Sequence, residues 1–165
     1  MSNSADFSRL SASWLYWAPL TGLTNARVSE QHPHDEIRFT ADDYAVHLRR
    51  DEDWWVIDTV DDRGQLHSDT AKFTTYALLE RYLIWQWASA ARNVLRLPRI
   101  GPKLYSLGHN PSVQFLPVKE GIYELCAPEG RAVLMEPGAT IYSHLMSKSV
   151  AEIEQLVKRD VQPDD

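Results

Sequence analysis

The chain has 165 residues, a length that corresponds to about one domain with its own hydrophobic core. Its 44% hydrophobic content, with six Trp and seven Tyr, excludes a disordered protein. The formal net charge of −6 argues against general nucleic-acid binding, which needs a basic surface. No apolar run approaches the ~18 residues of a membrane span and no signal peptide is recognisable, so we expect a cytoplasmic protein without membrane partners.

The first third of the chain predicts one helix and an antiparallel meander. The helix runs from Asp6, which can cap it, to Ala18, where Pro19 stops it. Three strands are expected after it, over residues 36–40, 44–50 and 54–60. Two acidic turns join these strands, Asp42-Asp43 and Asp51-Glu52-Asp53. Alternate positions of the second strand are polar, so one face of the sheet is expected to contact water.

Two adjacent tryptophans open the third strand. Because neighbouring residues of a strand point to opposite faces, Trp54 and Trp55 cannot both fill the same core. One of them is left for a second layer of the fold or for a binding partner. Trp is often an anchor residue in protein interfaces.

A long amphipathic helix is predicted from Phe73 onward, ending in the tetrapeptide Leu97-Pro98-Arg99-Ile100. The stripe expected to face the core consists of Phe73, Tyr76, Ala77, Leu83, Ile84, Trp87, Ala91, Val94 and Leu95. Glu80 lies near the centre of this stripe, so we expect a buried structural charge held by an Arg, an indole N–H or a tyrosine hydroxyl. A catalytic acid is the alternative at this position.

The same helix has a second apolar stripe, formed by Leu78, Tyr82 and Trp85 at helical spacing. A helix that is apolar on two sides is either buried between layers or partly free to receive another protein. Both alternatives are open for this stripe.

The rest of the chain predicts a second group of strands and a final helix. Residues 61–72 read as a turn and a polar segment, and the residues after Ile100 as a loop. Strands are expected over 113–118, 121–127 and 131–136, and a strand or short helix over 140–146. A capping box at Ser149 begins a helix that continues to about Arg159, before a frayed tail over 161–165. The predicted fold is a single α+β domain over residues 1–165, mainly an antiparallel sheet with a long central helix and N- and C-terminal helices.

Catalytic signatures are missing from the sequence. It has no phosphate-binding Gly loop, nucleophile elbow or HExxH helix. His32-Pro33-His34-Asp35 looks like a metal-ligand cluster but lacks further ligands placed by secondary structure, and the single Cys126 is expected in a buried strand. We therefore predict no catalytic residue, no cofactor and no metal, and a binding protein rather than an enzyme.

Several short motifs resemble one family. They are Trp54-Trp55-Val56-Ile57 followed by Asp62-Arg63, Leu79-Glu80-Arg81-Tyr82-Leu83, Arg92, Leu97-Pro98 with Ile100, Gly130-Arg131-Ala132-Val133, and Ser149-Val150. In order and character these pieces resemble the immunity proteins that neutralise the tuberculosis necrotizing toxin and related secreted NAD-hydrolysing toxins. The resemblance extends over residues 44–159, and its motifs are mostly positions that define a fold.

The resemblance implies an antitoxin that binds its cognate toxin domain one-to-one and blocks access of NAD to the toxin's active site. Acidic side chains can complement a site built for a pyrophosphate, and aromatic side chains can anchor the complex. The candidate interface residues are Asp42, Asp43, Asp51, Glu52, Asp53, Trp54, Tyr82 and Trp85. A non-catalytic interaction module or secretion chaperone is the first alternative, and an enzyme with a site around Glu80 is the second.

Overall fold

Eight strands and five helices form the protein, in a computed structural model that describes residues 5–161. The predicted α+β class, with an antiparallel sheet and a long central helix, is confirmed. The first part of the chain contains α1 (Ser8–Leu20), β1 (Arg27–Ser29), β2 (Ile37–Thr40), β3 (Ala45–Asp51), β4 (Trp54–Val60) and β5 (Leu66–Phe73). The second part contains α2 (Tyr76–Val94), α3 (Gly101–Ser106), β6 (Gln114–Lys119), β7 (Ile122–Ala127), β8 (Gly130–Met135), α4 (Gly138–Ser143) and α5 (Val150–Val157).

The strands form one antiparallel sheet in the order β1-β2-β3-β4-β5-β8-β7-β6. It consists of two meanders, β1–β5 and β6–β8, which meet at a seam between β5 and β8. The seam contains two residue pairs, Lys72–Val133 and Phe73–Ala132. It is extended by the backbone N–H of Arg131, which donates to Thr74 Oγ1 at 2.9 Å.

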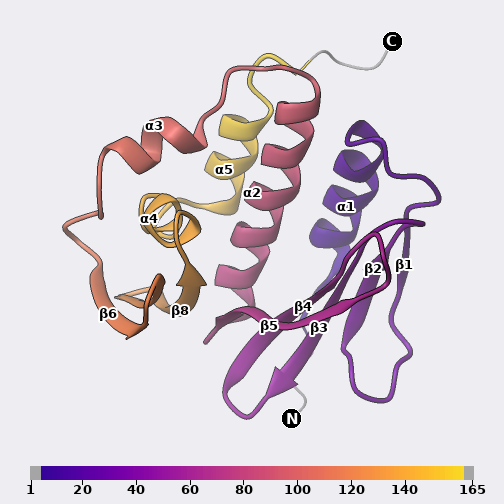
Figure 1. The fold of residues 1–165 in the computed structure, drawn as a ribbon, viewed down its shortest axis with the longest axis horizontal. Coiled ribbons are helices and arrows are strands. Elements are labelled where there is room, and N and C mark those ends of the chain that lie inside the picture. Colours follow the sequence, from indigo (N-terminus) through magenta and orange to yellow (C-terminus); the bar gives the residue numbers. More distant parts are fainter. Residues whose placement is uncertain (1–4, 162–165) are drawn as a thin grey trace.

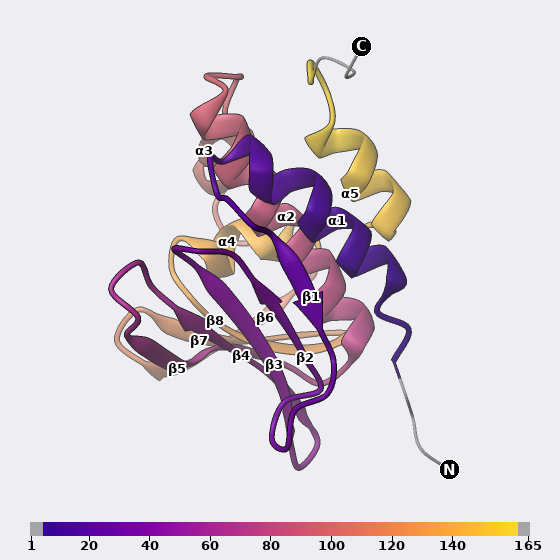
Figure 2. The same ribbon diagram turned by 90° about the vertical axis from the view of Figure 1, so that its right-hand side faces the viewer.

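The helices lie on one side of this sheet, as Figures 1 and 2 show. Helices α1 and α5 both pack against α2, and α4 packs against the second meander. The core between helices and sheet is rich in aromatic residues, and its largest fully buried side chains include Trp14, Trp17, Phe39, Phe73 and Tyr142. Trp55 is buried in this core, while Trp54 is half-buried on the opposite face of the sheet, as strand alternation predicts. None of the helices within residues 5–161 is long and apolar enough to cross a membrane.

Helix α2 is buried over a wider arc than the predicted stripe. Leu78 and Trp85, from the second stripe, are buried, whereas Ala77, Val94 and Leu95 from the first stripe are exposed. The reason is that α1, α5 and the sheet cover different sides of α2, while the end of the helix after Arg92 is uncovered. The predicted phase of the helix was therefore partly wrong.

Three elements were not predicted: β1, β5 and α3. The polar segment before Lys72 is part of β5, whose first five residues are exposed. Helix α3 lies in the predicted loop after Ile100 and has no buried residue. All three lack the apolar periodicity that marks a strand or helix in a sequence.

The predicted ends of the terminal helices also need correction. Helix α1 continues through Pro19 to Leu20, and Phe7 rather than Asp6 is its N-cap residue. A proline in the last turn removes one hydrogen bond without ending the helix there. The capping box of Ser149 with Glu152 is present in α5, although the helix ends at Val157. The segment 140–146 adopts the helical alternative as part of α4 and its following turn, and residues 162–165 of the predicted tail lie outside the described part.

Arg92 has a structural role that the sequence left open. Its side chain is 4% exposed, and its guanidinium donates to the backbone carbonyls of Val157, Arg159 and Pro98. The first of these carbonyls is at the last residue of α5 and the second is in the turn that follows, where the helix dipole favours a cation. Arg92 therefore fastens both α5 and the loop after α2 to the central helix.

Candidate functional site

Two adjacent cavities lie along α2, with volumes of about 540 and 570 Å³. They share four lining residues, Thr70, Tyr82, Gln86 and Ala90, and we call the combined depression the α2 groove. Figure 1 shows α2 flanked by α1 on one side and by α3 and α4 on the other. Each cavity occupies one of these flanks. Volumes of this size are typical of binding pockets.

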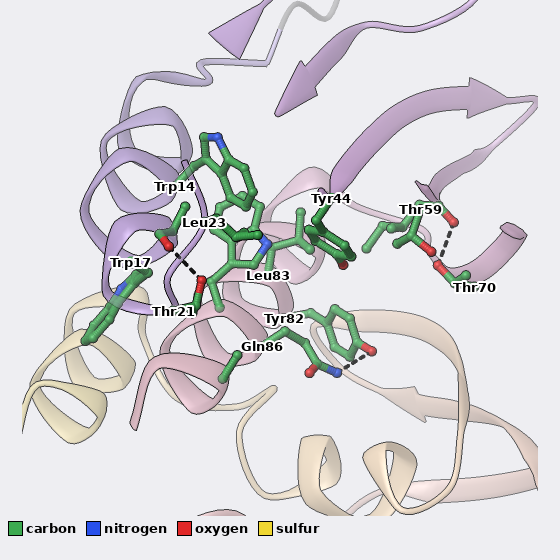
Figure 3. Close-up of a pocket in the computed structure, with 14 residues that line it drawn as sticks. Trp14, Trp17, Thr21, Leu23, Tyr44, Thr59, Thr70, Tyr82, Leu83 and Gln86 are labelled. Carbon is green, nitrogen blue, oxygen red and sulfur yellow. Dashed lines mark hydrogen bonds between the residues drawn. The ribbon is translucent and has the colours of Figure 1, made fainter. Parts of the chain in front are cut away.

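The first cavity lies between α1, α2 and strands β3–β5 (Figure 3). It is lined by Trp14, Trp17, Ala18, Thr21, Leu23, Tyr44, Ile57, Thr59, Thr70, Tyr82, Leu83, Gln86, Trp87 and Ala90. No charged side chain of the described residues is among them. The cavity is therefore apolar and aromatic, and its polar groups are hydroxyls, one amide and the indole N–H groups of its tryptophans.

Four of the hydroxyls lie at one edge of the first cavity, whereas the Thr21 hydroxyl lies beside Trp17 (Figure 3). Figure 3 shows the hydroxyls of Tyr44 and Tyr82 on the same side as Thr59 and Thr70. Gln86 Nε2 donates to the Tyr82 hydroxyl at 2.6 Å. Burial raises the pKa of Tyr44 to about 12, with a further contribution from Tyr82, and burial also raises the pKa of Tyr82. A phenol with its ordinary pKa is already neutral near pH 7, so both side chains keep an O–H that can donate a hydrogen bond.

The second cavity lies between α2, α3, α4 and the end of β8, and its edges are more polar. Its lining includes three charged residues, Arg92, Arg99 and Glu136. Arg99 donates to Asn93 Oδ1 at 2.7 Å, and the Glu136 carboxylate accepts from the backbone N–H and hydroxyl of Thr140, both at 2.6 Å. Because the rim carries both signs of charge, it suits a bound segment with polar groups better than a segment with a strong positive or negative net charge.

Two candidates predicted on α2 line this groove. Tyr82 is half-buried and lines both cavities. Trp85 lines the second cavity but is 5% exposed, so burial between layers is the alternative that the structure adopts for it. Asp42 and Asp43 are exposed in the β2–β3 turn beside Tyr44, another lining residue.

The remaining candidates lie elsewhere. Asp51, Glu52 and Asp53 are exposed at the opposite end of β3 from the Asp42-Asp43 turn, about 20 Å away for a strand of this length. Trp54 follows them on the sheet face that the helices leave uncovered. Its ring lies 4.9 Å from Lys72 Nζ and 5.7 Å from the Arg131 guanidinium carbon, which are cation–π distances. The structure therefore divides the predicted interface residues between two ends and two faces of the molecule.

Sequence patterns did not point to several lining residues of the groove, among them Trp14, Trp17, Thr70, Gln86 and Ala90. The first two looked like core residues of a helix, and Thr70 lay in the unpredicted strand β5. Their common location depends on how α1, α2 and β5 pack, which helix and strand periodicity does not show.

Glu80 is half-buried, which corrects the prediction of a fully buried charge. It does not line either cavity of the groove. Burial raises the pKa of Glu80, and nearby Arg9, the Tyr76 hydroxyl and Arg81 offset part of that rise. Among the described residues Glu80 forms no ion pair, since Arg9 pairs with Glu154 instead, and the Tyr76 hydroxyl makes no hydrogen bond.

We expect Glu80→Gln to keep or raise the free energy of unfolding at pH 7, by at most ~1 kcal/mol because solvent screens a half-exposed group. The raised pKa means that the folded state holds the proton more tightly than the unfolded state. Stability from Glu80 is thus fully present below its unfolded pKa and is lost as pH rises through the folded pKa. Urea titrations at pH 4 and pH 8 should show that the free energy of unfolding depends less on pH in Glu80→Gln than in the parent protein.

Glu120→Gln is the matched control, because Glu120 is exposed in the β6–β7 turn. It should leave the pH dependence unchanged. A loss above ~1 kcal/mol at pH 7 in Glu80→Gln alone would instead mean that the carboxylate is a paired structural charge.

The histidine loop and Cys126 were the sequence features considered as metal ligands. Within residues 5–161, no group of three or more His, Cys, Asp or Glu is arranged to hold a metal ion. His32 Nε2 is 2.6 Å from the Ser29 hydroxyl. Cys126 is partly exposed in β7 rather than buried, and burial with the neighbouring Glu124 raises the pKa of its thiol. A protonated thiol is a poor nucleophile and a poor metal ligand.

An α+β domain with an uncharged aromatic cavity and exposed acidic turns belongs to the class of proteins suited to binding another protein. The sequence model of the family described as Immunity protein 61 matches residues 17–160. The chain therefore belongs to this family of immunity proteins, which confirms the resemblance at the family level and supports an antitoxin role.

A solved structure shares the fold. It is Rv3902c from M. tuberculosis, with a TM-score of 0.68 and 16% sequence identity, over 94% of this chain and 90% of that chain. No curated protein matches the sequence.

Proposed function

We propose that the protein is an antitoxin that binds a cognate NAD-hydrolysing toxin one-to-one in the cytoplasm and blocks its active site. The observation that carries this proposal is the match of residues 17–160 to an immunity-protein family. The chemistry of the toxin is inferred from the motif resemblance to immunity proteins of the tuberculosis necrotizing toxin.

The charge of the protein supports this partner. The net charge is −6, and the turns Asp42-Asp43 and Asp51-Glu52-Asp53 are exposed. A site that binds the pyrophosphate of NAD presents positive charge or N–H donors, so acidic turns would attract it and speed association. Such steering acts mainly on the association rate and weakens with salt.

The test is NAD hydrolysis by the toxin domain encoded beside this gene, with and without one equivalent of the purified protein. We expect full loss of hydrolysis at a one-to-one ratio, and no NAD hydrolysis by the protein alone. Undiminished hydrolysis in the presence of a stable complex would overturn the proposal in favour of a secretion chaperone or adaptor.

The enzyme alternative is weakened by the position of Glu80. A catalytic acid must reach substrate in an accessible pocket. Glu80 lies outside both cavities of the groove, and Arg9 and Tyr76 are close enough to influence its pKa. Its surroundings are those of a residue at the junction of α1, α2 and α5.

A further inference from the structure

We propose that the α2 groove receives the toxin, and that the toxin fills its first cavity with an uncharged segment carrying aromatic or aliphatic side chains. This inference rests on the proposed function and adds to it the location of the contact and the chemistry of the contacting segment. Of the two surfaces that carry candidate interface residues, it selects the groove and not the surface around Trp54.

The charge of the lining determines what can enter the first cavity. None of its described lining residues is charged, so a Lys, Arg, Asp or Glu side chain would lose its hydration without gaining a counter-charge. An aromatic or aliphatic side chain loses no such hydration and gains contact with the partly exposed lining residues Leu23, Tyr44 and Tyr82. The acidic turns can therefore attract a basic toxin surface, whereas the first cavity favours an uncharged segment.

One face of α2 forms a ridge that separates the two cavities of the groove. Tyr82, Gln86 and Ala90 are spaced four residues apart, so they lie on one face of the helix, and they line both cavities. Ala90 is exposed, and its small side chain leaves the ridge low between the two cavities. A polypeptide segment can thus cross α2 at this point and contact both cavities.

Polar groups at the edges can hold the backbone of such a segment. The neutral hydroxyls of Tyr44 and Tyr82 can donate to carbonyl oxygens. On the other flank, Arg99 and Glu136 provide a donor and an acceptor at the rim of the second cavity. An uncharged core of contact with polar groups around it is the usual anatomy of a protein interface.

The Asp42-Asp43 turn fits this arrangement, because it precedes Tyr44 directly and remains exposed. It would form part of the polar rim of the complex. The Asp51–Asp53 turn and Trp54, at the other end of β3, would lie away from the contact.

The test compares charged substitutions at Ala90 with the same substitutions at Ala77. Both alanines are exposed on α2, but Ala77 does not line the groove. We expect Ala90→Arg and Ala90→Glu each to weaken binding of the adjacent-gene toxin domain at least ~30-fold, because either charge would be buried unpaired in the complex. Ala77→Arg and Ala77→Glu should change the Kd less than ~3-fold. All four variants should keep the parent melting temperature, because both positions are exposed.

The two signs of charge make the chemical part of the inference falsifiable. If one substitution at Ala90 weakens binding and the other strengthens it, the toxin segment is charged, and the inference is overturned. If both Ala90 variants bind like the Ala77 variants, the groove is not the contact. In that case full inhibition by the parent protein would leave the proposed function standing, whereas absence of inhibition by the parent protein would end both proposals.

A photo-crosslinking amino acid at position 90 identifies the segment directly. We expect it to capture one toxin peptide, and that peptide to present aromatic or aliphatic side chains without Lys, Arg, Asp or Glu at the crosslinked position. The same amino acid at position 77 should capture no toxin peptide. Capture of a charged position at residue 90, or of toxin at residue 77 alone, would contradict the inference.

Discussion

Trp85→Ala is expected to lower the free energy of unfolding by ~3–5 kcal/mol, the cost of removing a large buried aromatic side chain. Trp85 is 5% exposed and lies under the start of α3. Gly101 at the start of α3 packs against the Trp85 ring and Ile141, so the ring fills the space between α2, α3 and α4. Urea denaturation monitored by far-UV circular dichroism measures the loss.

Trp54→Ala is the matched control for this prediction. Trp54 is half-buried on the uncovered face of the sheet, and its ring contacts two cations there. We expect Trp54→Ala to lower the free energy of unfolding by less than ~1.5 kcal/mol, since only part of the Trp54 side chain is removed from water. Equal losses in the two variants would mean that Trp85 is not part of the packed core between α2, α3 and α4.

Arg92→Met is expected to lower the free energy of unfolding by ~2–4 kcal/mol. The substitution leaves three backbone carbonyls without their donor, each costing about 1 kcal/mol or more where water cannot replace it. For a domain of this size the corresponding fall in melting temperature is about 4–16 °C. Because α5 and the loop after α2 are both released, hydrogen exchange should increase at Val157 and Leu97.

Arg99→Met serves as the control for Arg92. Arg99 is exposed and donates to Asn93 on the surface, so its removal should cost less than ~0.5 kcal/mol. Arg92→Lys should be nearly as destabilising as Arg92→Met, because one ammonium group cannot reach three carbonyls in the geometry of the guanidinium fork. A Lys variant as stable as the parent would show that the charge at the end of α5, and not the shape of the donor, stabilises this region.

The strands with regular alternation were the ones that the sequence predicted well. The acidic turns around β3 and the capping box at Ser149 also carry local signals, and both are where they were expected. Strand β5 gives no such signal because its first five residues are exposed and polar. Its strand conformation depends on β4 and β8, so it is a consequence of tertiary pairing.

The candidate site was less predictable than the fold, for a similar reason. The apolar spacing of Tyr82 and Trp85 pointed to the side of α2 that forms the groove. It could not show that Trp85 would be covered by α3, since α3 itself has no sequence signal. Nor could it bring Trp17 of α1 and Thr70 of β5 to the same cavity, because that contact exists only after three elements have packed.

The seam between β5 and β8 has a consequence for the order in which the protein assembles. Each meander consists of neighbouring strands joined by short turns, so it forms by closing small loops. The contact between Thr74 and Arg131 joins residues 57 positions apart, and closing so long a loop costs more chain entropy than any hairpin of the sheet. Contacts of such long range slow folding. The two meanders can thus form early and separately, with α2 between them, and the sheet becomes continuous only when they dock.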